Sequence, residues 1–337
     1  MGLLQTIFRY VVGAIVWLAL LIGTLWTIGA LWFDFPIAAM RHVLAVSFGV
    51  VAMALLIFVR PRSRAKIAVA TAIVLVVAWW FTLKPSQDRD WKPEVAVLGH
   101  ATIEGERVTI HNVRNIDYRS ETDFTPRYDT RSYNLQNLRG VDLFVTYWGS
   151  PSIAHPIFSF DFGEDGRVCF SIETRSQRGQ SYSAIGGLYR QFEQIYIAAD
   201  ERDVIRLRSN FRQGEDVYLY RFVAPPQAAR AAFLEYIRTL NDLHERPRWY
   251  NAIVNNCTTA IRQQRTAAER APWDWRMLAN GYADEMLYER EAIERFGLPF
   301  AELKRRAHIN ARARAANDAP DFSERIRTHF AISPARE

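Results

Sequence analysis

The sequence lacks several motifs that identify common enzyme classes. It holds only two cysteines, Cys169 and Cys257, among 337 residues. It has no Gly-rich phosphate loop, and the pair Gly186-Gly187 lacks the partners that a nucleotide site needs. It has no GxSxG nucleophile elbow, which excludes that route to a serine nucleophile. The sequence also has no internal repeat, which argues against a solenoid or propeller.

The sequence also shows no ligand spacing typical of a metal site and no motif typical of nucleic-acid binding. The acidic residues of the middle region match no metal-ligand spacing and predict a solvated acidic loop: Asp161, Glu193, Asp200, Glu201 and Asp203. We therefore expect no metal and no cofactor. The net charge of +6 comes with no groove-binding or single-strand motif, so nucleic acid is not an expected partner.

Three uncharged apolar runs occupy the N-terminal part of the chain, namely Tyr10–Phe33, Val43–Val59 and Ile67–Leu83. The first is long enough to cross a bilayer, and the other two are just long enough. Tryptophans near the ends of these runs are typical of a membrane interface: Trp17, Trp26, Trp32, Trp79 and Trp80. A buried helical hairpin is the alternative for the two short runs. A cleaved signal peptide is disfavoured, because the first run is too long and lacks a small-residue cleavage site.

Charge placement predicts how these runs are oriented. The loop between the second and third runs is basic, with Arg60, Arg62, Arg64 and Lys66. The positive-inside rule puts this loop, and with it the N-terminus, in the cytoplasm. Everything after the third run then lies outside. We therefore expect a multi-pass protein of the bacterial inner membrane with a periplasmic C-terminal domain.

The chain is expected to have four parts. They are a membrane anchor of three transmembrane helices over residues 1–84, a juxtamembrane linker over 85–106, a thiol-enzyme domain over 107–316 and a polar tail over 317–337. Strands precede helices in the third part, which predicts an α+β fold. The expected strands are Arg107–Asn112, Val141–Trp148, Ile153–Phe162, Arg167–Arg175, Val204–Leu207 and Val217–Phe222, and helices are expected at Pro226–Leu243 and beyond Pro272.

Cys257 lies in a context that favours reactivity. It follows Asn255 and Asn256, which are good helix caps, and precedes residues that can continue a helix. A cysteine in the first turn is exposed to the positive end of the helix dipole, which favours the nucleophilic thiolate. The alternative, in an oxidising compartment, is a structural disulfide with Cys169.

His155 is the candidate base. It lies on the polar face of a predicted hairpin, and pairing Phe158 with Phe170 puts it directly across from Glu173. A slip of one repeat would put it across from Arg175 instead. A carboxylate beside a histidine fixes the tautomer and raises basicity, as in a catalytic triad. The alternatives are a plain surface histidine, and a Glu173 that pairs with Arg175.

An oxyanion would need donors near the thiol. The backbone N–H of Cys257, with support from Asn256 and Tyr147, could supply them. The alternative is that these side chains belong to turns and to the core.

Long segments of the chain are familiar. The strings VDLFVTYWGSPSIAHPIFSFDF, VCFSIETR, VYLYRF and NNCTTAI resemble the Lnb N-terminal periplasmic domain family, from about Val108 to beyond Ile261. The resemblance implies a papain-like, circularly permuted thiol fold of the NlpC type, with an antiparallel sheet and a helix that bears the cysteine. The family's histidine and cysteine correspond to His155 and Cys257. Some relatives are lipoprotein N-acyltransferases, but this chain lacks the long C-terminal membrane region associated with them.

These features predict a membrane-anchored periplasmic cysteine acyltransferase or acyl hydrolase. Cys257 would be the nucleophile, His155 the base and Glu173 the orienting carboxylate. The expected partners are the bilayer and a lipid-linked substrate, either a lipoprotein or a phospholipid. Two alternatives stay open: a papain-like peptidase or amidase of the cell envelope, and a non-catalytic envelope binding module. The oligomeric state is not predicted.

Overall fold

The computed structural model describes residues 2–253, 273–277 and 279–331. The chain divides into two compact units. The first comprises the residues up to Asp88 together with Ser181–Glu193 and Trp249–Ala252, and the second comprises the rest.

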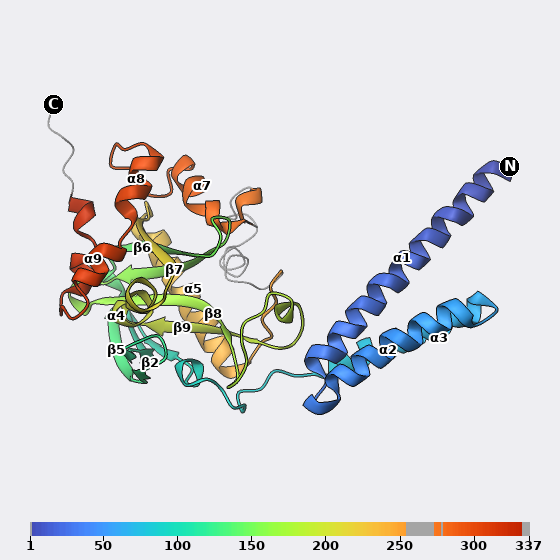
Figure 1. Cartoon of the computed structure of the whole chain (residues 1–337). Helices are drawn as coiled ribbons and strands as arrows, with labels where there is room; N and C mark the ends of the chain where they lie inside the picture. Colours follow the sequence, from blue (N-terminus) through green and yellow to red (C-terminus); the bar gives the residue numbers. More distant parts are fainter. Residues whose placement is uncertain (1, 254–272, 278, 332–337) are drawn as a thin grey trace. The chain divides into compact units, whose positions relative to one another are not determined.

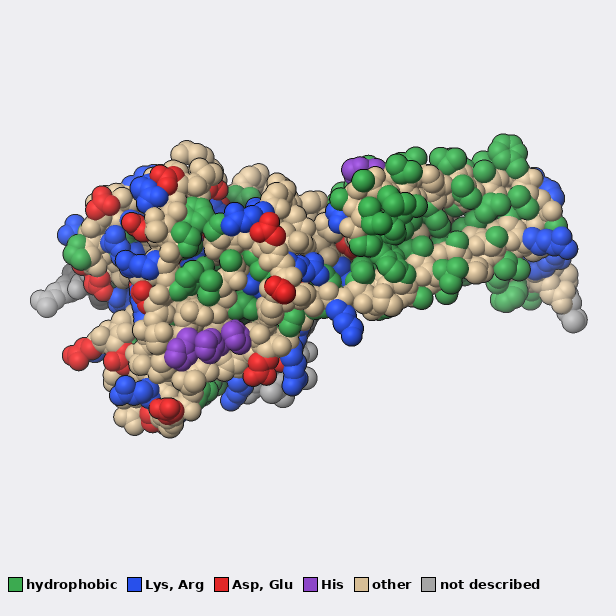
Figure 2. Space-filling model, turned by 90° about the horizontal axis from the view of Figure 1, so that it is seen from below, with side chains coloured by type: hydrophobic (Ala, Val, Ile, Leu, Met, Phe, Trp, Pro, Cys, Tyr) green, Lys and Arg blue, Asp and Glu red, His purple; other side chains and the backbone are tan. Residues whose placement is uncertain are grey.

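The first unit contains three helices that are long and apolar enough to cross a membrane: α1 (Gly2–Asp34), α2 (Ala38–Phe58) and α3 (Arg62–Thr82). Their side chains leave a large apolar surface exposed, and Figure 2 shows hydrophobic groups over most of the visible face of these helices. An exposed apolar surface of this extent requires a nonpolar environment. The three expected runs are therefore helices of membrane-spanning length.

A loop from the middle of the chain packs against the ends of α1 and α3 within this unit. Asp34, the last residue of α1, accepts hydrogen bonds from the Trp80 indole N–H at 2.6 Å and the Arg190 backbone N–H at 3.0 Å. The Arg190 guanidinium lies 4.0 Å from the centre of the Trp80 ring. These contacts fasten residues 181–193 to the helix ends through polar and cation–π interactions.

Gly29 allows the same loop to approach α1 closely. A Cβ atom at Gly29 would lie 1.9 Å from the Tyr189 hydroxyl oxygen, so a larger residue cannot occupy this position without displacing Tyr189. The Tyr189 ring also stacks on Phe33, with 5.2 Å between ring centres. Glycine is therefore required here by the tyrosine packed against the helix.

The second unit is built on an eight-stranded sheet, in the order β1-β2-β9-β8-β7-β6-β10 with β5 paired to β2 (Figure 1). Its strands are β1 (His100–Glu104), β2 (Arg107–Arg114), β5 (Tyr128–Asn134), β6 (Gly140–Trp148), β7 (Ala154–Asp161), β8 (Arg167–Arg175), β9 (Glu193–Ala199) and β10 (Glu215–Arg221). A separate small ribbon pairs β3 (Asp117–Tyr118) with β4 (Phe124–Thr125). The sheet is mixed rather than antiparallel throughout, because β9 meets β2 in parallel.

Helices cover both faces of the sheet. The helices of the second unit are α4 (Glu201–Arg206), the π-helical turn η5 (Leu207–Phe211), α5 (Pro226–Glu245), α7 (Ala283–Glu289), α8 (Phe300–Ala307), α9 (Asn310–Ala315) and α10 (Phe322–Arg325). Among its described residues, short 3₁₀ turns add η1 (Pro93–Val95), η2 (Leu135–Asn137), η3 (Gly163–Asp165), η6 (Trp275–Met277), η7 (Asn280–Tyr282) and η8 (Thr328–Ala331). A further turn, η4 (Gly186–Leu188), belongs to the first unit.

Alternation along β7 and β8 sends apolar side chains to both helix layers. Phe160 and Phe170 join Phe233 of α5 in one core. On the opposite face, Ile157 and Cys169 join a second core with residues of α4, α9 and α10. The polar residues of the candidate site share this second face, so helices shield them from water.

Several expectations differ from the structure. Val204–Leu207, predicted as a strand, lies in α4 and η5, because its β-branched residues face a core on one side of a helix. The predicted linker contains β1, which pairs with β2. Glu193, Glu201 and Asp203, predicted in a solvated loop, are at most 1% exposed.

Long-range ion pairs explain this burial. The Arg327 guanidinium donates to Glu201 at 2.5 Å and to Asp142 at 2.8 Å, and Arg114 donates to Asp203 at 2.8 Å. Arg327 belongs to the stretch predicted as a polar tail, which in fact carries the fully buried Phe322. A buried carboxylate requires such a partner, and each partner here comes from far along the chain.

Phe233 should be among the most important residues for stability. Its ring is fully buried and packs edge-on against Phe160 and Phe162. We expect Phe233→Ala to lower the free energy of unfolding by about 3–5 kcal/mol. Arg238→Ala, on the exposed side of the same helix, is the matched control and should change it by less than about 0.5 kcal/mol. Chemical denaturation of both variants measures the difference, and similar losses would contradict this account of the core.

Candidate functional site

His155 lies near the start of β7, on the face covered by α4 and η5. The ladder between β7 and β8 pairs Phe158 with Phe170, which confirms the first of the two predicted registers. Continuing that register places His155 across from Glu173, and the ring Nε2 is 3.9 Å from the Glu173 Oε1 atom. His155 is only 7% exposed, so it is not a surface histidine.

Ser171 connects the imidazole to the carboxylate. Its Oγ lies 2.8 Å from His155 Nε2 and donates to Glu173 Oε1 at 2.8 Å. Because the single hydroxyl hydrogen goes to the carboxylate, the Oγ atom accepts the N–H of Nε2. This pattern fixes the tautomer in which Nδ1 carries the basic lone pair.

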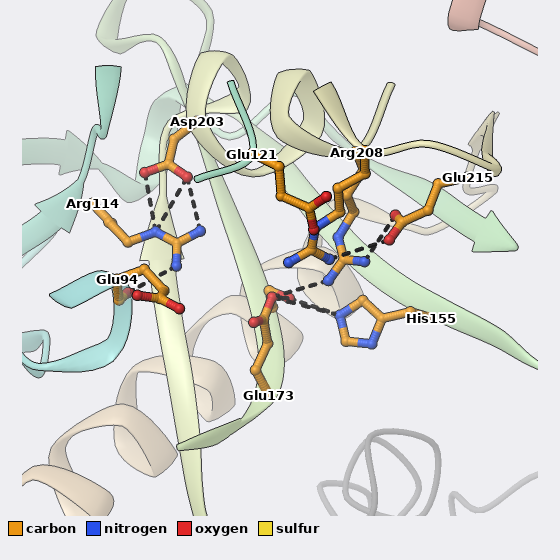
Figure 3. A network of polar contacts seen from close by, with 10 residues as sticks. Glu94, Arg114, Glu121, His155, Glu173, Asp203, Arg208 and Glu215 are labelled. Carbon is orange, nitrogen blue, oxygen red and sulfur yellow. Dashed lines mark hydrogen bonds and ion pairs between the residues drawn. The ribbon is translucent and has the colours of Figure 1, made fainter. Parts of the chain in front are cut away.

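Arg208 supplies the closest countercharge for this carboxylate, whose side chain is 20% exposed. Its guanidinium donates to Glu173 at 3.2 Å and to Glu215 at 3.2 Å (Figure 3). Arg208 lies in η5, a π-helical turn that continues α4 and aims the side chain at the sheet. Such turns are frequent at functional sites. Glu173 therefore pairs with Arg208, while Arg175 donates instead to the backbone carbonyl oxygen atoms of Val95 and Ala96.

The electrostatics of the site keep the imidazole neutral. Burial, together with the nearby Arg208 guanidinium, lowers the pKa of His155 to about 3, although Glu173 opposes the shift. Burial alone would raise the pKa of Glu173, but the charges of Arg208, His155, Arg114 and Arg212 together outweigh it and hold that pKa well below its usual range. The result is a neutral imidazole beside an ionised carboxylate.

Trp148 and Tyr147 take different places around His155. The Trp148 ring lies edge-on to the imidazole, with 6.5 Å between ring centres. Tyr147 points to the opposite face of the sheet, because adjacent residues of a strand alternate. Its hydroxyl donates to the Gly281 carbonyl oxygen at 2.7 Å and accepts from Lys304 at 3.1 Å. The structure therefore brings Trp148, but not the Tyr147 hydroxyl, to the imidazole.

Cys257 and Asn256, the predicted nucleophile and its neighbour, lie outside the described residues. The chain that follows them returns to β7 beside the imidazole. Asn280 forms two hydrogen bonds with the backbone of Ala154, donating to its carbonyl oxygen at 2.6 Å and accepting from its N–H at 2.8 Å. Asn280 is thus held one residue from His155 along the chain of β7.

Cys169, the other cysteine, is a free and fully buried thiol on β8. It forms no disulfide in the structure, which removes support for the structural alternative. Burial, with a contribution from the Glu201 carboxylate, raises the pKa of this thiol well above its usual value. A thiol in such surroundings is unreactive.

Two members of the network, Ser171 and Arg208, were not predicted from the sequence. Ser171 shares a strand face with Glu173, two residues away, so the alternation pattern could have identified it. Arg208 lies 35 positions from Glu173, directly after the predicted strand Val204–Leu207, and no local pattern could have paired the two. Among the described residues, no group of His, Cys, Asp and Glu side chains could hold a metal ion.

Comparison with known families agrees with the resemblance of the sequence. Residues 124–281 match the model of the Lnb N-terminal periplasmic domain, and the match includes His155, Glu173 and Cys257. No curated protein and no solved structure matches the chain.

The depressed pKa of His155 should appear in the pH dependence of stability. The unfolded chain takes up a proton near pH 6.5, whereas folded His155 does so only near pH 3. As pH falls between these values, we expect the free energy of unfolding to fall by up to roughly 1.4 kcal/mol per pH unit through this residue. His155→Gln should remove this slope, as measured by chemical denaturation from pH 4 to 7. His308→Gln, a partly exposed histidine, is the control, and equal slopes in wild type and His155→Gln would contradict the expectation.

Proposed function

Because residues 124–281 match the Lnb N-terminal periplasmic domain family, we propose that the protein is a membrane-anchored thiol enzyme of the bacterial envelope. In this proposal the three N-terminal helices span the inner membrane with the N-terminus in the cytoplasm, and the second unit lies in the periplasm. The domain has a papain-like, permuted chain order, in which the histidine strand precedes the cysteine helix. The reaction is acyl transfer or acyl hydrolysis through a thioester.

Nδ1 of His155 takes the proton of the Cys257 thiol in the first step. The thiolate sulfur then attacks the carbonyl carbon of an ester or amide, and the carbonyl oxygen becomes an oxyanion. The backbone N–H of Cys257 and the Asn256 amide hold this oxyanion. When the intermediate collapses, the bond to the leaving group breaks and His155 returns its proton to that group. Water or an amine then gives a proton to Nδ1 and attacks the thioester carbonyl carbon. The carbon–sulfur bond breaks, and the departing thiolate recovers the proton from His155.

The connection of His155 through Ser171 to Glu173 is the observation that supports this proposal best. A buried histidine with a fixed tautomer and a low pKa stays neutral at physiological pH, as a base must. Arg208 keeps the carboxylate ionised, so it can stabilise the imidazolium that forms during the reaction. A histidine with only a structural role has no need of this arrangement.

The surroundings support a lipid-linked substrate. Large apolar side chains are exposed in the loops on either side of the His155 strand and the Asn280 anchor: Trp148 at 41%, Ile153 at 52%, Trp273 at 63% and Trp275 at 55%. Exposed aromatic groups of this kind suit a membrane interface or an acyl chain. The chain between α3 and the second unit is only six residues long, Leu83–Asp88, so it reaches at most about 20 Å. A short tether of this kind favours a membrane-linked substrate, either a phospholipid or a lipoprotein.

The nucleophile can be tested by trapping the thioester. Full-length protein incubated with a phospholipid that carries a labelled acyl chain should retain a label that neutral hydroxylamine removes. Cys257→Ala should reduce this label at least roughly 10³-fold, because no other group can form the thioester. Cys169→Ala is the matched control and should keep it, since that thiol is buried and unreactive. Undiminished label in Cys257→Ala would refute the assignment, and turnover of peptidoglycan fragments instead of lipids would favour an envelope amidase.

Ser171→Ala tests the orienting contact. Without the hydroxyl, Nε2 loses its acceptor and the imidazole loses its fixed tautomer, so kcat should fall roughly 10–100-fold with little change in KM. Ser171→Thr keeps a hydroxyl and should recover most of the rate. Ser159→Ala removes a buried serine of β7 that donates to Glu201 of α4, and it should leave kcat unchanged. An equal loss of kcat in both alanine variants would indicate a general loss of structure instead.

A further inference from the structure

A second polar site lies away from His155, in the second unit. A cavity of about 180 Å³ opens beside the ribbon of β3 and β4 and the start of α4. Its lining comprises Asn115, Ile116, Asp117, Arg127, Arg202 and Arg206. Pockets that enclose drug-sized ligands are larger, roughly 300–1,000 Å³, so this cavity suits one small polar group.

The lining has an excess of positive charge. The lining holds three guanidinium groups and one carboxylate, Asp117. Arg127 also has a distant partner outside the lining, since its Nε lies 3.9 Å from the Asp129 carboxylate. The pairing that exists is weak, because Asp117 is 67% exposed and its oxygen is 3.4 Å from the Arg206 guanidinium. The Arg206 side chain itself is only 5% exposed. A buried guanidinium usually has a closer anionic partner than this.

Backbone carbonyl groups hold two of the arginines in place without neutralising them. Arg206 donates to the carbonyl oxygen atoms of Arg202 at 2.9 Å and Asn317 at 3.2 Å. Arg202 donates to the carbonyl oxygen atoms of Ala319 and Asn317. Among the described residues, no carboxylate lies within ion-pair distance of Arg202. These carbonyl contacts fix the direction of the side chains but leave their charge for another partner.

The charges around Arg206 do not balance its own charge. Burial, and next the neighbouring Arg202 guanidinium, lowers the pKa of Arg206, and the carboxylates of Asp117 and Asp318 do not offset these effects. An anion in the cavity would reverse this imbalance. Guanidinium groups form paired hydrogen bonds with tetrahedral oxyanions, which favours phosphate over a spherical ion.

We propose that this cavity is a phosphate-binding site, in which Arg127, Arg202 and Arg206 bind the oxygen atoms of a phosphate group. The site is independent of the thiol chemistry. The phosphate belongs either to a soluble phosphate compound or to a phospholipid headgroup, since both present the same oxygen atoms. Arg206 and Arg202 form the fixed floor of the site, and the exposed Arg127 covers the bound group.

Thermal unfolding of the full-length protein in a neutral detergent tests the proposal. One arm adds inorganic phosphate or pyrophosphate, with sodium chloride at the same ionic strength as the control. The other arm adds dioctanoyl phosphatidylglycerol, with dioctanoylglycerol, which lacks the phosphate, as the control. Near saturation, we expect the effective ligand to raise Tm by roughly 2–4 °C.

Three variants separate this site from general charge effects. Arg127→Gln and Arg202→Gln should each remove most of the Tm shift. Arg238→Gln, which removes an exposed arginine on α5, should keep it. A shift with soluble phosphates identifies a soluble ligand, and a shift with phosphatidylglycerol alone identifies a lipid headgroup. If neither ligand exceeds its control, or if Arg127→Gln and Arg202→Gln respond like wild type, the proposal is wrong.

Discussion

The largely buried carboxylate of Glu173 has its closest countercharge in the Arg208 guanidinium, and the arrangement of the candidate site follows from that pair. Glu173 lies on the strand beside β7, under a helical layer that excludes most water. An ion left without its partner in such a place costs about 3–5 kcal/mol. Arg208 therefore has to reach the sheet, and the π-helical turn η5 gives it the direction to do so. The charged carboxylate of Glu173 accepts the hydroxyl hydrogen of Ser171, and the Ser171 oxygen in turn accepts the Nε2 hydrogen of His155.

The part of the site that lies on the hairpin of β7 and β8 was predictable from the sequence. Phenylalanines alternate with polar residues on β7 and β8, and matching the two apolar faces allowed only two registers. The structure adopts the register that sets His155 across from Glu173. Ser171 lay within the same pattern. β-branched and aromatic residues also predicted β6 to within one residue, and the bounds predicted for β8 are those of the structure.

Contacts between distant segments were not predictable in the same way. Arg208 reaches Glu173, and Arg327 reaches Glu201, across 35 and 126 positions of the chain. Each member alone resembles an ordinary surface charge, and only tertiary packing shows that it is buried. The same reason explains why Glu201 and Asp203 were predicted in a solvated loop and why Phe322 was placed in a tail. Val204 and Ile205 caused a different error, in which a helix was predicted as a strand. β-branched residues on one side of a short helix resemble those of a strand.

The hydroxyl between the carboxylate and the imidazole has a consequence for chemistry. A carboxylate in direct contact with Nε2 would favour the imidazolium and raise its pKa. Here Glu173 Oε1 stays 3.9 Å from Nε2, and Ser171 occupies the space between them, so the carboxylate orients the ring without charging it. Arg208 adds to this effect, because its positive charge also disfavours the imidazolium. In the proposed mechanism, His155 therefore begins as a neutral base with Nδ1 ready to accept the thiol proton. The imidazolium becomes favourable only once a thiolate, or the oxyanion derived from it, supplies a negative charge beside Nδ1. The network thus couples protonation of His155 to the presence of the reacting sulfur.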